Sequence, residues 1–226
     1  MAWREWIRDG VEVEPSLYAA DFRRLGAQID ALLAAGCRIF HFDCGDGHFV
    51  PPVTMGPVVL RSIARSIHEA GGRLDCHLMV DDPAHHLEEF ASSGADSVTF
   101  HVEAAPDADR VAEQARAHGL GVGIAFNPGT EPAQAAAAAN EAAADIVLCM
   151  SIHPGYSGQS FMPEALGRIE ALAALVDVPI QVDGGVGEGN VRALRDAGAS
   201  LLVAGSSVFS GSDPAEAYAR LAASAA

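Results

Sequence analysis

The sequence predicts an α/β protein that forms a single (β/α)₈ barrel, or TIM barrel, with a short N-terminal capping extension. The chain is 226 residues long, half of its residues are hydrophobic, and short apolar runs alternate with helix-like stretches throughout. A barrel of eight strand–helix units needs roughly 200–250 residues, so we expect one domain over residues 1–226. An open doubly wound sheet is the alternative. No Gly-x-Gly-x-x-Gly sequence follows the first strand, which argues against its dinucleotide-binding form.

Eight apolar runs are the predicted strands. They are short and mostly bounded by Gly, Asp or Pro, as expected of parallel strands that are buried on both faces. In chain order they cover residues 11–17, 38–43, 73–79, 97–101, 121–127, 146–151, 179–183 and 201–205.

Helix-like stretches lie between these runs, and several begin with a capping residue or a Pro and end at Gly. They include residues 20–35, 83–93, 108–118, 163–175 and 189–197, and the Ala-rich residues 133–144 are interpreted as another outer helix. Residues 1–10 are predicted to form a capping turn, with Trp3 and Trp6 packed on the barrel.

Composition excludes several classes of function. The net charge is −16 and no basic run is present, so we expect no nucleic-acid partner. All fourteen basic residues are Arg, which excludes a lysine Schiff base or a lysine-bound cofactor. We also expect no membrane partner, because no apolar run is long enough to cross a bilayer and charges interrupt any N-terminal signal peptide. The four cysteines form no Cys-x-x-Cys pair, and a reducing cytoplasm is the expected location.

Polar side chains stand near the ends of the second, third and seventh predicted strands, where such barrels carry their chemistry. Side chains alternate along a strand, so His41 and Asp43 share a face and point into the barrel if the phenylalanines beside them face the helices. By the same parity His77 points inward from the third strand, and Asp183 stands at the tip of the seventh. We therefore expect two imidazoles and two carboxylates to meet in one barrel mouth.

A metal ion is the best explanation for this group of four. Each residue alone could be satisfied by ordinary hydrogen bonds, but together they place unpaired carboxylates in an apolar interior at a cost that a cation offsets. Two His and two Asp suit one divalent cation, namely Zn²⁺, Fe²⁺, Mn²⁺ or Co²⁺. His101 and His153 also end strands and could line the pocket without binding the metal.

Glycine-rich loops follow the sixth, seventh and eighth predicted strands. They contain residues 153–159, the pair Gly184-Gly185, and Gly205-Ser206. Barrels frequently hold a phosphate between their last loops and a helix N-terminus, and Gly lets the backbone N–H groups approach it closely. These loops predict a phosphate site that needs no lysine.

A metal, a phosphate site and two aspartates on separate strands suit proton removal next to a ketone. A metal on the carbonyl oxygen stabilises the enediolate. One carboxylate removes the proton from one face and a second returns a proton to the other face, which inverts the carbon. Asp43 and Asp183 could flank a bound sugar in this way.

Family motifs also run through the chain in order, over roughly residues 12–212. They are Pro15-Ser16-Leu17, Ala20-Asp21-Phe22, His41-Phe42-Asp43, Asp46-Gly47-His48-Phe49-Val50-Pro51, His77-Leu78-Met79-Val80, His101-Val102-Glu103-Ala104, Met150-Ser151, Pro154-Gly155, Gly158-Gln159-Ser160-Phe161, Val182-Asp183-Gly184-Gly185-Val186 and Ala204-Gly205-Ser206. With these motifs the chain resembles the ribulose-phosphate 3-epimerase family.

The resemblance implies a (β/α)₈ barrel that interconverts ribulose 5-phosphate and xylulose 5-phosphate in the pentose phosphate pathway, and it implies a homo-oligomer. It implies that Asp43 and Asp183 are the acid/base pair. The implied metal ligands are His41, Asp43, His77 and Asp183. The implied substrate contacts are Ser16, His77, Met79 and Met150. The implied phosphate contacts are Gly155, Tyr156, Ser157, Gly158, Gly184, Gly185, Gly205 and Ser206.

The chain departs from the family pattern at four positions. Gly45 stands where the family usually has Met, Pro52 where Asn is usual, and Ser157 where Gly is usual. Glu14 stands where Ala is common, and it shares strand parity with Ser16, so it is predicted to point into the barrel. Our hypothesis is that Gly45 leaves room for a longer ketose phosphate.

Three functions are alternatives to epimerisation of ribulose 5-phosphate. A 3-epimerase for a six-carbon substrate such as allulose 6-phosphate would keep every site residue. A phosphosugar decarboxylase on a similar barrel relies on a catalytic lysine, which this chain lacks. A non-catalytic barrel that binds a sugar phosphate would not need two intact acid/base aspartates.

Overall fold

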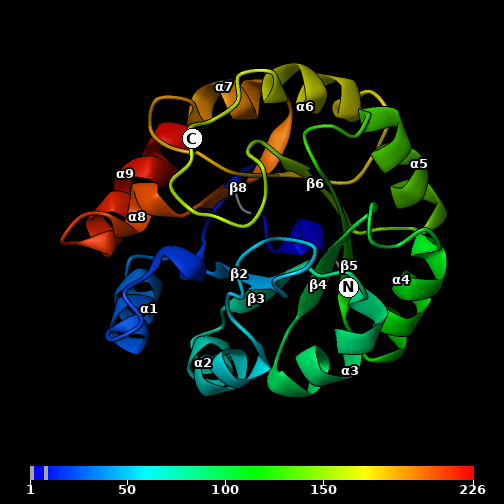
Figure 1. The fold of residues 1–226 in the computed structure, drawn as a ribbon. Helices are drawn as coiled ribbons and strands as arrows, with labels where there is room; N and C mark the ends of the chain where they lie inside the picture. Colours follow the sequence, from blue (N-terminus) through cyan, green and yellow to red (C-terminus); the bar gives the residue numbers. More distant parts are fainter. Residues whose placement is uncertain (1–2, 8–9) are drawn as a thin grey trace.

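The computed structural model describes residues 3–7 and 10–226, and they form the predicted (β/α)₈ barrel (Figure 1). All strand pairs are parallel, in the order β1-β8-β7-β6-β5-β4-β3-β2. The seam between β1 and β2 is joined by a single bridge between Ser16 and His41, so the barrel is nearly closed. The strands are β1 (Glu12–Pro15), β2 (Ile39–Gly45), β3 (Arg73–Met79), β4 (Ser97–His101), β5 (Gly121–Phe126), β6 (Ile146–Met150), β7 (Ile180–Asp183) and β8 (Ala199–Ala204).

Helices form a ring around the strands (Figure 1). They are α1 (Leu25–Ala34), α2 (Pro57–Glu69), α3 (Pro83–Ser93), α4 (Ala108–Ala117), α5 (Pro132–Glu141), α6 (Ala165–Ala173), α7 (Val191–Asp196), α8 (Ser206–Phe209) and α9 (Pro214–Ala225), with two short 3₁₀ helices, η1 (Trp3–Glu5) and η2 (Leu17–Ala19). None of the helices in the described part of the chain has the length and apolar character that a membrane span requires.

Sequence signals account for the outer helices. In α2 the buried residues Leu60, Ile63, Ala64 and Ile67 recur at helical spacing, which gives one apolar face toward the strands. In α3 the Asp82 side chain caps the N-terminus by accepting from the backbone N–H of His85, and Pro83 occupies the first turn.

The predicted strand parity is confirmed in β2. Phe40 and Phe42 are fully buried in the core between strands and helices, where Phe42 packs edge-on against Phe90 of α3. His41 and Asp43 alternate with them and lie on the inner face of the barrel. An apolar shell between strands and helices therefore holds a polar barrel interior in place.

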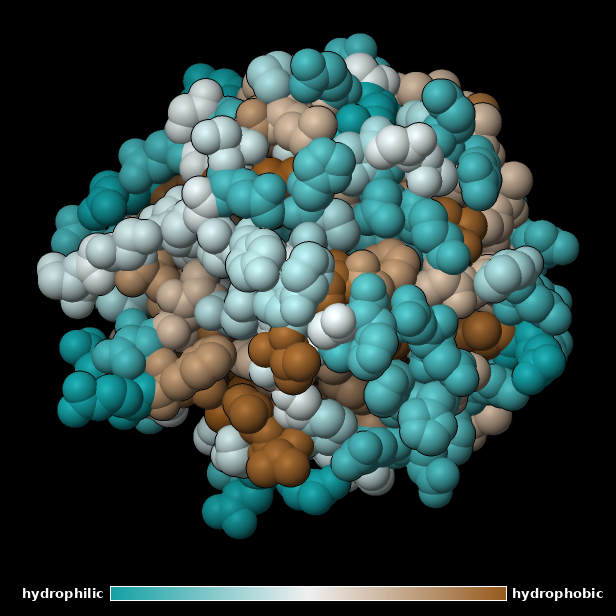
Figure 2. All heavy atoms as spheres, in the orientation of Figure 1, coloured by the Kyte–Doolittle hydropathy of each residue, from teal (hydrophilic) through white to brown (hydrophobic). Residues whose placement is uncertain are grey.

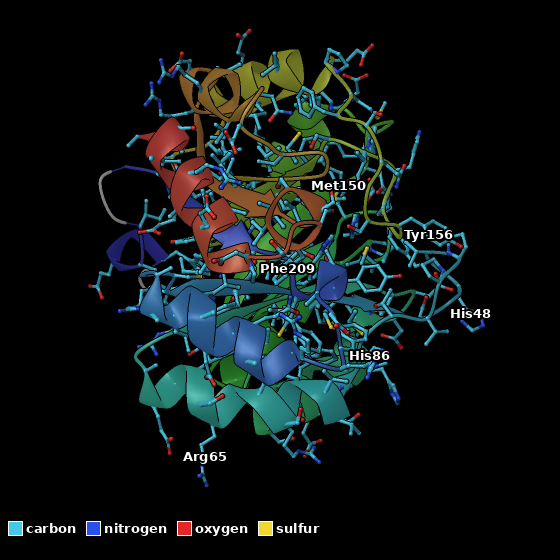
Figure 3. The ribbon with its side chains drawn as sticks, turned by 90° about the vertical axis from the view of Figure 1, so that its left-hand side faces the viewer. His48, Arg65, His86, Met150, Tyr156 and Phe209 are labelled. Carbon is cyan, nitrogen blue, oxygen red and sulfur yellow. The ribbon has the colours of Figure 1, made fainter. Side chains whose placement is uncertain are left out.

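The N-terminal segment closes the end of the barrel where the strands begin. Trp3 is buried, its ring lies 4.5 Å from that of Trp6, and both pack with Ile39 and Ile146, which open β2 and β6. Figure 3 shows Tyr156 and His48 at the opposite end of the barrel. Residues 1–2 and 8–9 of the predicted capping extension lie outside the described residues.

The predicted helix over residues 20–35 begins later than expected, at Leu25. Asp21 forms a turn instead, because its carbonyl accepts from Arg24 N–H and its side chain accepts from Arg23 N–H. Its own backbone N–H is bound by the side chain of Gln28. The turn keeps residues 20–24 out of the helix, between η2 and the start of α1.

Candidate active site

Four predicted ligand residues lie together at the carboxyl ends of β2, β3 and β7. One donor atom from each of His41, Asp43, His77 and Asp183 lies within 4.8 Å of the others. Asp43 is central, since its Oδ1 is 3.3 Å from His41 Nε2 and 3.2 Å from His77 Nδ1. Asp183 Oδ2 lies 3.8 Å from the same nitrogen of His77. The strand register explains the contact, because Asp43 and His77 are paired residues of neighbouring strands.

The donor set fits a divalent metal ion. Within the described residues, the buried Nε2 atom of His41 has no hydrogen-bond partner, although its other ring nitrogen lies 3.2 Å from Asp75 Oδ2. A lone pair on that Nε2 can therefore point at a cation. Two imidazole nitrogens and two carboxylate oxygens in a buried cluster are a donor set that Zn²⁺, Fe²⁺, Mn²⁺ and Co²⁺ accept.

The two aspartates have opposite electrostatic environments when the protein groups alone are considered. Burial raises the pKa of Asp43, but the charge and hydrogen bonds of His41 outweigh it and hold the pKa well below its usual range. Burial and then the Asp43 charge raise the pKa of Asp183 to about 7. One carboxylate is thus ionised while the other is poised between acid and base near neutral pH.

His41 is strongly basic in the same surroundings. Burial lowers its pKa, but the Asp43 charge and the close contacts with Asp43 and Asp75 outweigh that effect and raise the pKa well above the ordinary value. A bound metal ion would replace the proton on this ring, since only the neutral imidazole coordinates.

A cavity opens directly above the cluster, and the predicted substrate and phosphate residues line it. Ser16, Met79 and Met150 are on its wall together with Asp43 and Asp183. The rest of the predicted set also lines it, namely Gly155, Tyr156, Ser157, Gly158, Gly184, Gly185, Gly205 and Ser206. Met150 and Tyr156 lie on the same side of the barrel in Figure 3.

Three histidines lie off the cavity wall. His77 is fully buried and is not among the described residues that line the cavity, and its predicted contact with the substrate stays a prediction. Both of its ring nitrogens already face neighbours, Asp43 on one side and His101 on the other. His101 is fully buried and His153 is exposed, and neither is among the described residues that line the cavity.

Backbone geometry explains the glycines on the predicted phosphate side. Gly184 and Gly185 have φ values of +121° and +63°, which L side chains rarely adopt. A Cβ on Gly184 would collide with Ile152, and one on Gly185 would lie 2.5 Å from the Phe161 nitrogen. Among the described residues that line the cavity there is no Arg, so N–H groups and hydroxyls are the available anion donors.

The hypothesis about Gly45 is wrong in its physical premise. A Cβ on Gly45 would lie 2.8 Å from Val50 Cγ2 and 2.9 Å from the Pro52 carbonyl oxygen, and Gly45 does not line the cavity. The missing side chain makes room for the β2–α2 loop and not for substrate. Thr54 fixes that loop, because its hydroxyl accepts from Gly45 N–H and donates to the Asp43 carbonyl.

A second layer of buried polar side chains, Glu14, Asp75 and Gln181, lies beneath the cluster, and of these only Glu14 was predicted. Glu14 points into the barrel as predicted and is fully buried, which raises the pKa of its carboxyl to about 7. Gln181 Nε2 donates to Glu14 Oε2 at 2.6 Å and to Asp75 Oδ2 at 2.8 Å. Asp75 and Gln181 were missed, although each stands two residues before a predicted ligand and so shares its face.

Comparisons with known proteins show the family to which the chain belongs. The family described as "Ribulose-phosphate 3 epimerase family" matches residues 12–209. The chain is 36% identical over 214 residues to a ribulose-phosphate 3-epimerase, cytoplasmic isoform, of Oryza sativa, covering 93% of this chain and 92% of the relative. It is 37% identical to the Escherichia coli K12 enzyme of that name, covering 87% and 88%, and 40% identical to the Synechocystis one, covering 92% of each.

Solved structures with much lower identity share the fold. A 3-hexulose-6-phosphate synthase superposes with a TM-score of 0.75 at 20% identity, covering 96% of this chain and all of the other. An orotidine 5'-phosphate decarboxylase from Pyrococcus horikoshii gives 0.71 at 15%, covering 95% and 99%. At these identities the likeness concerns the barrel alone.

Proposed function

The chain belongs to the ribulose-phosphate 3-epimerase family and is an epimerase of the isomerase class, and from this we propose that it inverts C3 of D-ribulose 5-phosphate to give D-xylulose 5-phosphate. The proposal rests on one observation above all. Asp43 and Asp183 both reach the cavity, and their environments push the pKa of one carboxyl down and of the other up. Such a pair suits removal of a proton from one face of a carbon and delivery to the other.

The proposed reaction consists of two proton transfers at C3. Ionised Asp43 takes the proton from C3, and the electron pair of that C–H bond moves into the C2–C3 bond while charge develops on the C2 oxygen. Protonated Asp183 then delivers its proton to the opposite face of C3, and the carbonyl re-forms with inverted configuration. The reverse reaction exchanges the two roles.

We propose that His41, Asp43, His77 and Asp183 hold the metal ion. When bound, a divalent cation there would stabilise the negative charge that develops on the substrate's carbonyl oxygen. Zn²⁺, Fe²⁺, Mn²⁺ and Co²⁺ all suit the two nitrogens and two oxygens. Metal analysis of the purified protein decides among them.

The phosphate is proposed to lie against the β6–α6, β7–α7 and β8–α8 loops. Ser157 supports this, because its hydroxyl oxygen lies 3.1 Å from the position a Cβ would take on Gly205, beside the first residue of α8. N–H groups and hydroxyls in these loops can bind a dianion without a cationic side chain. The substitution of a family Gly by Ser157 thus adds a donor.

We infer a place in the pentose phosphate pathway from the family to which the chain belongs. We also infer a cytoplasmic location, which the name of the rice relative supports. We also infer a homo-oligomer. Figure 2 shows a group of hydrophobic residues on the surface, over the region where Figure 1 has β2 and α2. The exposed side chains of Val53, in the β2–α2 loop, and Val58, in α2, belong to this region, and an exposed apolar patch of this kind is typical of a protein–protein contact. Light scattering after gel filtration measures the oligomeric state.

An Asp183→Asn variant separates catalysis from binding. We expect it to lose turnover while still binding ribulose 5-phosphate, because the amide cannot donate a proton to carbon but fills the same space. Glu170→Gln, an acid-to-amide change on the exposed face of α6, is the matched control and should leave turnover unchanged. An Asp183→Asn protein that turns over normally would refute the two-aspartate proposal and favour another catalytic mechanism.

A further inference from the structure

The ring of His101, at the end of β4, lies directly behind the predicted ligand His77. The two Nε2 atoms are 2.8 Å apart, and the rings are inclined by only 22° with their centroids 5.0 Å apart. Both side chains are fully buried. Two ring nitrogens at this distance share one hydrogen, so one histidine must donate and the other accept.

Glu103 determines which of the two donates. Its Oε2 lies 3.3 Å from His101 Nδ1, and its Oε1 accepts from the Asn127 N–H at 2.8 Å and from the Thr130 hydroxyl. Burial opposes ionisation of Glu103, but the hydrogen bonds from His101 and Thr130 outweigh it and lower its pKa to about 2. An ionised carboxylate only accepts, so the hydrogen of His101 is on Nδ1.

The remaining assignments follow from donor and acceptor counting. With its hydrogen on Nδ1 toward Glu103, His101 presents the lone pair on Nε2 to the His77 ring. His77 must then donate from Nε2, which leaves the lone pair of His77 on Nδ1. That nitrogen is the one that faces Asp43 and Asp183.

We propose that His101 and Glu103 are positioning residues that fix the tautomer and orientation of His77, so that Nδ1 of His77 faces the metal position. The inference rests on the proposed metal site. It extends that site past the end of β4 to Glu103, whose side chain is partly exposed, whereas His77 is fully buried. Phe49 of the β2–α2 loop packs on the ring of His101, and the centroids of the two rings are 4.7 Å apart.

The other ligand histidine is held in the opposite sense. His41 directs Nδ1 at Asp75 and leaves Nε2 toward the cluster. The two histidines therefore present different nitrogens to the same position: His41 is backed directly by the Asp75 carboxylate, and His77 is backed by His101, which is itself held by Glu103. Second-layer groups of this kind orient metal ligands and contribute about 10–100-fold to metal affinity.

The test uses Glu103→Gln, a partly exposed position where the shape of the side chain is kept. The glutamine can still accept from Asn127 and Thr130 through its oxygen, and its NH₂ group then faces His101 Nδ1. Two donors cannot face each other, so His101 must move its hydrogen to Nε2 and His77 must move its own to Nδ1. Glu131→Gln, at the exposed N-terminus of α5, is the matched control.

The readouts are the ¹⁵N histidine tautomers by NMR, with and without Zn²⁺, and the Zn²⁺ dissociation constant from competition with a chelator. We expect wild-type His77 to carry its hydrogen on Nε2 even without metal. In Glu103→Gln the His77 tautomer should change and Zn²⁺ should bind about 10–100-fold more weakly. The control variant should match wild type in both readouts.

Two results would overturn the inference. One is a wild-type His77 with its hydrogen on Nδ1; the other is a Glu103→Gln protein with unchanged tautomers and Zn²⁺ affinity, even if its melting temperature falls. If the variant does not fold, Thr130→Val removes one donor to Glu103 and should weaken Zn²⁺ binding in the same direction; unchanged binding there also counts against the inference. A wild-type protein that binds no Zn²⁺ would refute the metal site. The tautomer measurement would still test whether Glu103 and His101 fix the tautomer of His77.

Discussion

Ser16 and Asp43 are joined across the seam of the barrel, where the Ser16 hydroxyl donates to Asp43 Oδ2 at 2.6 Å. A backbone bridge between Ser16 and His41 and a contact of 3.7 Å between Glu14 Oε2 and His41 Nδ1 also join this seam. Asp43 Oδ2 is thus held by the Ser16 hydroxyl, and Asp43 Oδ1 faces His41 and His77. The closure of the barrel and the orientation of the proposed base depend on the same residue.

Ser16→Ala should therefore lower turnover. A hydrogen bond to a charged group contributes about 1.5–3 kcal/mol, which corresponds to roughly 10–100-fold in kcat/KM if it is fully used in orienting Asp43. Ser16→Thr should retain part of the activity because the hydroxyl remains. Steady-state kinetics on ribulose 5-phosphate measure the effect, and an Ser16→Ala enzyme with wild-type kcat/KM would show that this contact does not orient the base.

Gly45→Ala should destabilise the protein without changing which sugar it prefers. The new Cβ would lie within 2.9 Å of Val50 and of the Pro52 carbonyl, so the β2–α2 loop must shift, at a cost of about 1–3 kcal/mol. Urea denaturation measures the loss, and parallel assays with five- and six-carbon ketose phosphates measure preference. A changed preference at unchanged stability would restore the hypothesis that Gly45 shapes the substrate pocket.

Glu14→Gln should change the pH dependence of stability in metal-stripped protein. Because burial raises the folded-state pKa of Glu14 from 4.5 to about 7, the folded state binds an extra proton between these values. The stability linked to this proton is full below pH 4.5 and is lost as pH rises through 7, a loss of roughly 3 kcal/mol that glutamine does not suffer.

The free energy of unfolding of Glu14→Gln relative to wild type should consequently rise between pH 4.5 and pH 8. Urea titrations of both proteins at several pH values measure this difference, with Glu170→Gln as the control for the chemical change. Parallel profiles for Glu14→Gln and wild type would mean that the buried carboxyl is solvated or paired more fully than the contacts with Gln181 and His41 indicate.

Periodicity in the sequence was sufficient for most of the fold. The strand over Arg73–Met79 and the helix over Pro83–Ser93 have the predicted bounds, because burial on both faces and a capping Asp-Pro leave local signals. The start of α1 was wrong, because hydrogen bonds of Asp21, one of them to Gln28 seven residues later, decide it. Helix α2 was not predicted, although its apolar spacing is regular.

For the site, strand parity predicted the meeting of His41, Asp43, His77 and Asp183, and their role as ligands stays a prediction. Strand parity does not predict the tautomer or the ring orientation of each histidine. The orientation of His77 depends on His101 and Glu103, which lie on another strand and the loop after it. The direction of the space beside Gly45 likewise depends on how a loop folds back, which no local pattern encodes.

The most direct test of the central claim follows the proton at C3. Metal-loaded protein is incubated with ribulose 5-phosphate in D₂O, and xylulose 5-phosphate and its C3 deuterium are followed by NMR, with and without a chelator. The account predicts xylulose 5-phosphate labelled at C3, because the proton that Asp183 delivers comes from the solvent pool, and it predicts loss of the reaction with chelator. Xylulose 5-phosphate without label, or no epimerisation by metal-loaded protein, would contradict it.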